Sequence, residues 1–71
     1  MYSVSCLANG HRQWSRNMRT GSRYFKTKAA YREHLARMLH IAKALKKSEP
    51  SSRIEVEAFF DDKPIYYITI V

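Results

Sequence analysis

Few side chains in this sequence are suited to chemistry, and their spacing argues against a catalytic or metal site. His34 and His40 are six residues apart on a predicted helix, about 240° around its axis, whereas zinc ligands on one helix face are typically four residues apart. The third histidine, His11, follows a predicted turn. Cys6 alternates with polar residues on a predicted strand, so we expect a small buried hydrophobe rather than a nucleophile. We therefore expect no metal and no cofactor.

Two carboxylates form the other candidate pair. Glu55 and Glu57 are two residues apart on a predicted strand and therefore point the same way. Such a pair can hold a metal ion or act as acid and base, but it is also typical of a solvated strand face, which we favour. The chain has only two glycines and no glycine-rich loop to cradle a phosphate. With no catalytic residues, we expect a binding protein rather than an enzyme.

The basic residues are unevenly distributed along the chain. Residues 1–32 contain seven of the thirteen Lys and Arg and no acidic residue, while the remaining six are balanced by all six Asp and Glu. The net charge of +7 therefore comes from the first half, and it predicts a polyanionic or acidic partner. We expect seven residues to bind this partner: Arg12, Arg16, Arg19, Arg23, Lys26, Lys28 and Arg32.

Other side chains between these cations favour nucleic acid as the partner, DNA ahead of RNA. Flexible arginines beside a hairpin turn suit phosphate contact, and polar side chains next to them can reach base edges. Aromatic rings can stack on unpaired bases, although each is also an ordinary core residue. The polar residues are Gln13, Ser15 and Asn17, and the aromatic residues are Trp14, Tyr24 and Phe25.

Residues 27–47 have the pattern of one long amphipathic helix. Apolar residues recur at helical spacing from Tyr31 to Leu45, and basic residues occupy the other side. Thr27 is suited to cap the start, and Pro50 prevents the helix from continuing. Glu33 and Arg37, four residues apart, predict an ion pair on the helix surface.

Residues 2–18 predict a β-hairpin around Asn9-Gly10, and residues 22–26 predict a short third strand or an extended lead into the helix. A two-residue loop would put Trp14 on the opposite sheet face from Val4. A three-residue loop that includes Ala8 would put the two side chains on the same face. We favour the three-residue loop because a large buried aromatic residue should decide the register.

Residues 53–71 predict a second hairpin. A three-residue turn at 61–63 would place Tyr66, Ile68 and Ile70 on the same face as the apolar residues of 54–58, whereas an even loop would place a less apolar set there. The last strand has no charge from Ile65 onward and strong β preference, so at an exposed edge it would be an aggregation template. We therefore predict that it is central and paired with the N-terminal strand. The alternative is pairing across a dimer.

Together these elements predict one α+β domain over residues 1–71, a mostly antiparallel sheet with the helix packed on one face. The apolar runs are too short for a transmembrane span or a signal peptide. The single cysteine fits a reducing compartment. We therefore expect a cytoplasmic protein, a monomer or homodimer, with no membrane partner.

Residues 2–45 also resemble the arm-type DNA-binding domain of phage tyrosine-recombinase integrases. The resemblance rests on short strands ending in an Arg-Thr-Gly turn (19–21), followed by an aromatic-Lys-Thr-Lys lead (25–28) into an amphipathic helix. It implies DNA-groove contact through Arg12 to Arg23. The second hairpin lies outside the pattern and the recombinase catalytic domain is absent, so integration activity is not implied.

Three functions follow as hypotheses. The first is a nucleic-acid-binding module encoded by a phage or another mobile element. The second is a protein-binding inhibitor, of the anti-CRISPR or host-takeover type, that turns its basic surface against a nucleic-acid-handling complex. The third is a toxin or antitoxin component.

Overall fold

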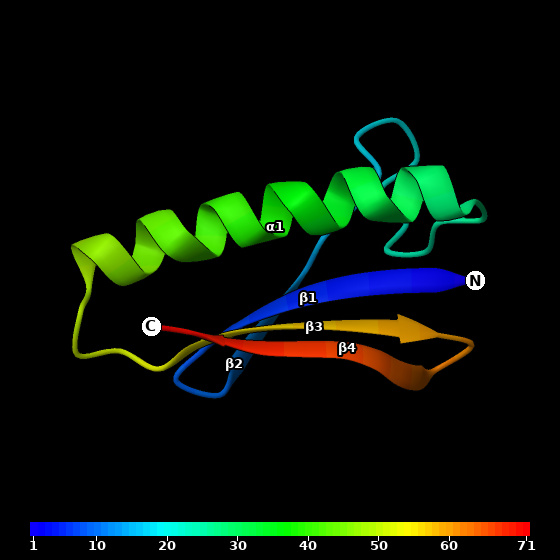
Figure 1. Cartoon of the computed structure of the whole chain (residues 1–71). Coiled ribbons are helices and arrows are strands. Elements are labelled where there is room, and N and C mark those ends of the chain that lie inside the picture. The colour runs from blue at the N-terminus through cyan, green and yellow to red at the C-terminus, as the bar shows by residue number, and fades with distance from the viewer.

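A computed structural model describes all 71 residues. The elements are β1 (Tyr2–Ala8), β2 (His11–Trp14), α1 (Lys28–Ser48), β3 (Ile54–Phe60) and β4 (Lys63–Ile70). The four strands form one antiparallel sheet in the order β2-β1-β3-β4, and α1 packs across one face (Figure 1). The predicted α+β fold of two hairpins and one helix is therefore confirmed.

The helix forms where its sequence pattern predicted. The side chain of Thr27 caps the first turn by accepting a hydrogen bond from Ala30 N–H at 3.2 Å. Lys46 and Lys47 lie in the last turn, where the helix dipole favours positive charge. The helix ends before Pro50. No helix here has both the length and the apolar character that crossing a bilayer requires.

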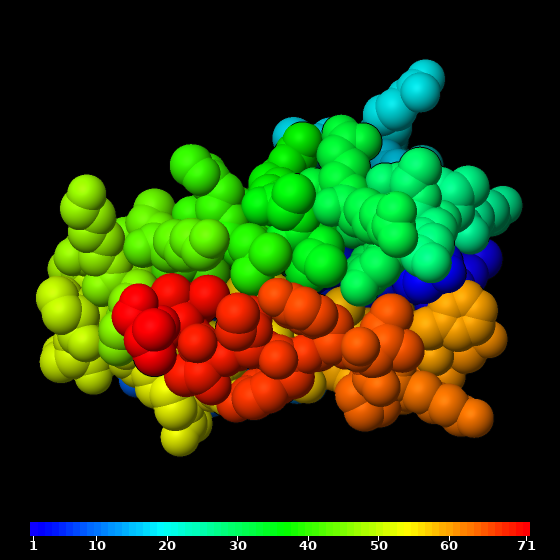
Figure 2. All heavy atoms as spheres, in the orientation of Figure 1, coloured from blue at the N-terminus to red at the C-terminus, as the bar shows by residue number.

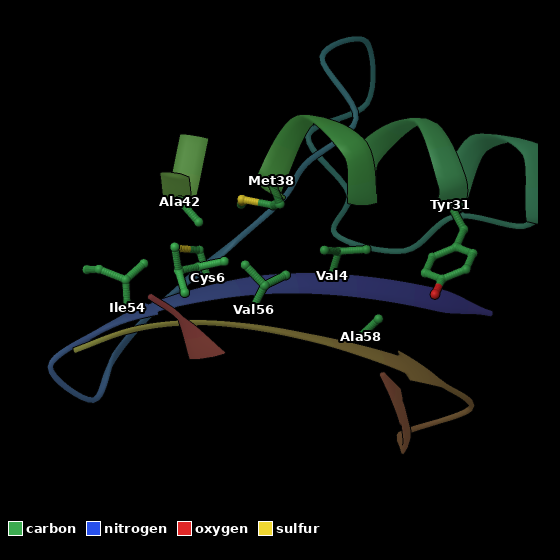
Figure 3. Packing of buried hydrophobic residues seen from close by; sticks show 9 residues of the cluster. Val4, Cys6, Tyr31, Met38, Ala42, Ile54, Val56 and Ala58 are labelled. Carbon is green, nitrogen blue, oxygen red and sulfur yellow. The ribbon is translucent and has the colours of Figure 1, made fainter. Parts of the chain in front are cut away.

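The core lies between α1 and the two central strands (Figure 3). Val4 and Val56 point up from β1 and β3, and Met38 and Ala42 point down from the helix. Cys6 is buried in the same cluster, and burial raises the pKa of its thiol, which keeps it protonated. Cys6 is thus the small buried hydrophobe that the sequence predicted.

The first hairpin has a two-residue loop, so the predicted three-residue loop is wrong. Ala8 pairs with His11 and Ser5 pairs with Trp14, which places Trp14 on the face away from the helix. Asn9 and Gly10 have φ of 52° and 86°, the left-handed values that a tight hairpin turn needs at both positions. The turn chemistry therefore decides the register, and the burial of Trp14 does not.

In the second hairpin, Tyr66, Ile68 and Ile70 lie on the predicted face, but the turn differs from the three-residue turn that was predicted. Its turn is also two residues, Asp61-Asp62, because Phe60 pairs with Lys63. The register then shifts by one residue, and Ile65 is the extra residue of a β-bulge. The bulge restores the parity, so Tyr66 lies opposite Ala58, and Ile68 and Ile70 follow on the helix side as predicted.

The predicted central position of the last strand is wrong. β4 pairs only with β3 and lies at the edge of the sheet, while β1 and β3 are central. The strand carries features that natural edge strands use against aggregation: Pro64, Lys63 and the bulge at Ile65. Residues 22–26, predicted to be a short third strand or an extended lead into the helix, form no strand and make a single bridge between Phe25 and Tyr2.

Candidate nucleic-acid interface

The seven predicted binding residues do not form one continuous surface. Arg12, Arg16, Arg19 and Arg23 lie on β2 and the segment that follows it, at one edge of the sheet. Lys28 and Arg32 line a groove on the other flank of α1, between the helix and the second hairpin. Lys26 lines a third groove, beside Met1 and Tyr24.

The groove at the β2 edge lies between β2, the following segment and α1. It encloses about 580 Å³ and is lined by three arginines, Arg12, Arg16 and Arg37, with no carboxylate among its lining residues. The other lining residues are Gln13, Trp14, Ser15, Met18, Met38 and Ile41. Since two of the arginines come from the predicted set, the structure brings part of that set together at a concave surface.

Arg37 also lines this groove, so it is a further candidate for binding the partner. The sequence had predicted it only as the ion-pair partner of Glu33. That predicted pair with Glu33 does not form. Arg37 instead lines the groove together with Ile41, one turn further along the same flank of the helix. Its position directly before the buried Met38 was the available signal, because neighbouring residues on a helix lie about 100° apart and Arg37 therefore borders the buried face.

Two of the predicted arginines are held against aromatic rings. Arg12 lies 3.1 Å from a Glu57 oxygen, with its guanidinium 5.3 Å from the centroid of the Trp14 ring. The guanidinium of Arg23 lies 4.4 Å from the same centroid, and Arg23 donates a hydrogen bond to the hydroxyl of Tyr24 at 2.7 Å. Phe59 packs at 5.8 Å from Trp14. The Trp14 ring is thus covered and is not a free platform for base stacking.

The segment between β2 and α1 is ordered by its own hydrogen bonds. Arg16 donates to the carbonyl oxygen of Gly21 at 2.9 Å, and Asn17 Oδ1 accepts from the backbone N–H groups of Arg19 and Thr20. These bonds fold the segment into a turn that projects from the body of the molecule (cyan in Figure 2). Arg19 is exposed on this turn, and its side chain makes no hydrogen bond or ion pair.

His34 ties this segment to the helix. Its Nδ1 and Ser15 Oγ are 2.9 Å apart, a hydrogen bond, and the Phe25 ring stacks on the imidazole with centroids 4.1 Å apart. Burial, then the charge of Arg37, lowers the pKa of His34, against a smaller opposite effect of Glu33. Phe25 is only 2% exposed. His34 and Phe25 are therefore structural, and base stacking by Phe25 is excluded.

Glu55 and Glu57, the candidate carboxylate pair, are both engaged in ion pairs. Glu57 pairs with Arg12, while Glu55 pairs with Arg53 at 2.9 Å and accepts a hydrogen bond from the Tyr67 hydroxyl. No three His, Cys, Asp or Glu side chains cluster as metal ligands would. Among the thirteen Lys and Arg, only Arg12 and Arg53 pair with a carboxylate, which leaves eleven without such a partner.

No protein-family model matches this chain, and neither does any curated protein or solved structure. The resemblance to integrase arm domains stays a prediction.

Proposed function

We propose that this chain is a non-enzymatic nucleic-acid-binding protein, with DNA ahead of RNA, whose contact surface is the groove between β2 and α1. The observation that carries the proposal is the set of three arginines that line the groove, of which Arg16 and Arg37 have no carboxylate partner and only Arg12 pairs with one, Glu57. A guanidinium presents forked N–H donors that match phosphate oxygens. The groove therefore offers several phosphate contacts at one concave site.

Three further features support nucleic-acid binding at this edge. Arg19, on the turn that projects next to the groove, adds an exposed charge with no partner. Met18 and Ile41 are exposed apolar residues at the groove, and they suit the sugars and base faces of a strand lying in it. The large excess of unpaired cations also favours association with a polyanion from a distance.

The proposal is tested by fluorescence anisotropy with short labelled duplex DNA, single-stranded DNA and RNA at about physiological salt. The test variant is Arg16→Glu/Arg37→Glu. The matched control is Lys43→Glu/Lys47→Glu, which changes the net charge equally on exposed helix positions outside the groove. We expect the groove variant to bind one of the nucleic acids at least tenfold more weakly than the control does. Equal losses in both variants, or no binding by the unchanged protein, would refute the proposal.

A further inference from the structure

The outer edge of β4 is an unpartnered strand with exposed apolar residues. Ile65, Tyr67 and Ile68 are 49%, 57% and 37% exposed. Asn9 N–H donates to Arg53 O where β3 begins, so the odd-numbered residues of β3 bond to β1 and the even-numbered ones bond to β4. By the same alternation, the N–H groups of Tyr67 and Thr69 point away from β3. The edge can therefore accept another strand.

Two basic grooves lie between this edge and α1. Near the start of β4, a groove of about 580 Å³ has Lys28, Arg32 and Lys63 around an apolar floor that includes Phe60 and Ile65. The ring of Tyr2 stacks on that of Tyr31 in the same floor, with centroids 4.7 Å apart. Near the end of β4, a second groove of about 360 Å³ is lined by Lys43, Lys46, Lys47, Pro50, Ile70 and Val71. Neither groove is lined by an Asp or Glu side chain.

The two basic clusters are spaced for an extended chain. Arg32 and Lys43 are eleven residues apart on the helix, or about 16 Å at 1.5 Å per residue. A strand of five residues covers about the same length at 3.3 Å per residue. Figure 2 shows β4 (orange to red) running along the surface below α1 (green), so one strand laid on the edge would pass both clusters.

From this arrangement we propose that the β4 edge docks an extended acidic segment of a partner protein by strand addition. Backbone hydrogen bonds to β4 would supply the pairing. Alternate side chains of the added strand would face the helix side, where acidic groups reach the two clusters, and the others would face Tyr67 and Thr69. This surface lies at the opposite edge of the sheet from the nucleic-acid groove and goes beyond the function proposed above.

A second copy of this chain fits the edge less well. Two β4 edges paired about a two-fold axis would form one continuous sheet with both helices on the same face. The pairing would be antiparallel, so the cluster near the start of each β4, which includes Arg32, would face the cluster near the end of the other β4, which includes Lys43. Like charges facing one another disfavour that dimer, whereas an acidic segment is complementary to both clusters.

The probe is a fluorescein-labelled ten-residue peptide of alternating glutamate and valine, and the control peptide has lysine in place of glutamate. We expect saturable binding of the acidic peptide only. Arg32→Glu/Lys63→Glu should weaken it roughly tenfold, since two attractions to the glutamates become repulsions. Arg16→Glu/Arg37→Glu makes the same charge change at the β2 edge and should leave peptide binding unchanged.

The backbone contribution is tested by Thr69→Pro, which removes one outward N–H, with Thr69→Val as the control. Edge strands accept proline where the N–H points to solvent, as Pro64 already does in β4. Loss of peptide binding in the proline variant alone supports strand addition. In ¹⁵N-resolved spectra of the unchanged protein, the peptide should shift the amide signals of β4 and leave those of β2 in place.

Several results would overturn the proposal. These are equal binding of the lysine peptide, unchanged affinity in Arg32→Glu/Lys63→Glu, or shifts confined to β2. If an oligonucleotide, but not the peptide, shifted the amide signals of β4, the edge would be assigned to nucleic acid instead. A concentration-dependent dimer in sedimentation, with the β4 amides protected from exchange, would assign the edge to a second copy.

Discussion

Trp14 lies directly across from Ser5 in the β1–β2 pair, so its ring rests on the sheet face that the helix does not cover. On that face it contacts Phe59 and is covered by the guanidiniums of Arg12 and Arg23. Ser5 is fully buried, although it lies on the face away from the helix. A small second cluster of aromatic and arginine side chains thus covers part of that face.

The first prediction concerns this cluster. Trp14→Ala removes the ring that packs on Phe59 and makes cation–π contacts with two arginines. We therefore expect a loss of about 2 kcal/mol in the free energy of unfolding. Urea denaturation followed by circular dichroism measures it. Trp14→Phe, which keeps a ring at the position, should lose less than half as much. A loss below about 0.5 kcal/mol for the alanine variant would contradict this prediction, since it is within the range of ordinary surface substitutions.

Ser5 gives a prediction of opposite sign. Its hydroxyl oxygen is buried with no hydrogen-bond partner. Replacing Ser5 by Ala removes an unsatisfied polar group, so we expect stability unchanged or raised by up to about 1 kcal/mol. Ser15→Ala is the contrast, because Ser15 is bonded to His34 and its loss should destabilise the protein. Thermal unfolding of both variants decides the point, and a destabilised Ser5→Ala would contradict it.

The hairpin turn supplies a third prediction. Gly10 has φ of +86°, and an added Cβ would meet only Arg53 Nη2 at 3.8 Å, so the cost of a side chain is backbone strain rather than a clash. Gly10→Ala should lose roughly 1–2 kcal/mol of stability. Gly10→Asn should lose less, since asparagine tolerates left-handed backbone. Chemical denaturation of the pair checks this, and equal losses would contradict the strain explanation.

The fourth prediction is a dependence of stability on pH. Burial, then Arg37, lowers the pKa of His34 below its ordinary value of 6.5 in the folded protein. As the pH falls, the unfolded chain therefore takes up this proton first, so the contribution of His34 to stability is present above pH 6.5 and is lost below it. Unfolding free energies at several pH values from neutral to acidic measure the slope. His34→Gln should flatten it, while His40→Gln, at an exposed position, should leave it as in the unchanged protein.

Local sequence patterns correctly predicted the helix and the strands. The order of the strands in the sheet depends on pairing between distant parts of the chain, and it was mispredicted for β4. The cap at Thr27, the helical period to Leu45 and the face shared by Tyr66 and Ile70 all depend on residues near one another in the chain. The edge position of β4 depends instead on which strand takes the free side of β3, and no local pattern carries that information. In the first hairpin, the Asn9-Gly10 turn indicated the correct register, whereas the size of Trp14 indicated the wrong one.

The candidate site was likewise predictable only in part, because its charge is visible in the sequence whereas its geometry depends on the tertiary structure. The excess of cations in the first half of the chain was visible in the sequence, and the structure gathers Arg12 and Arg16 at one edge. The separation of Lys28 and Arg32 from that edge follows from their angular position on α1, which lies between the two grooves. The position of Arg37 at the groove depends on how the helix lies across the sheet, which is a tertiary relationship.

The measurement that tests the central claim most directly is the salt dependence of DNA binding. The affinity falls as salt rises, and each phosphate contact that is lost should make the slope of log affinity against log salt less steep by about 0.7–0.9. Arg16→Ala/Arg37→Ala should therefore reduce the slope by roughly 1.5, and Lys43→Ala/Lys47→Ala should leave it nearly unchanged. An unchanged slope in the groove variant, or equal reductions in both variants, would contradict the assignment of the β2 groove as the nucleic-acid site.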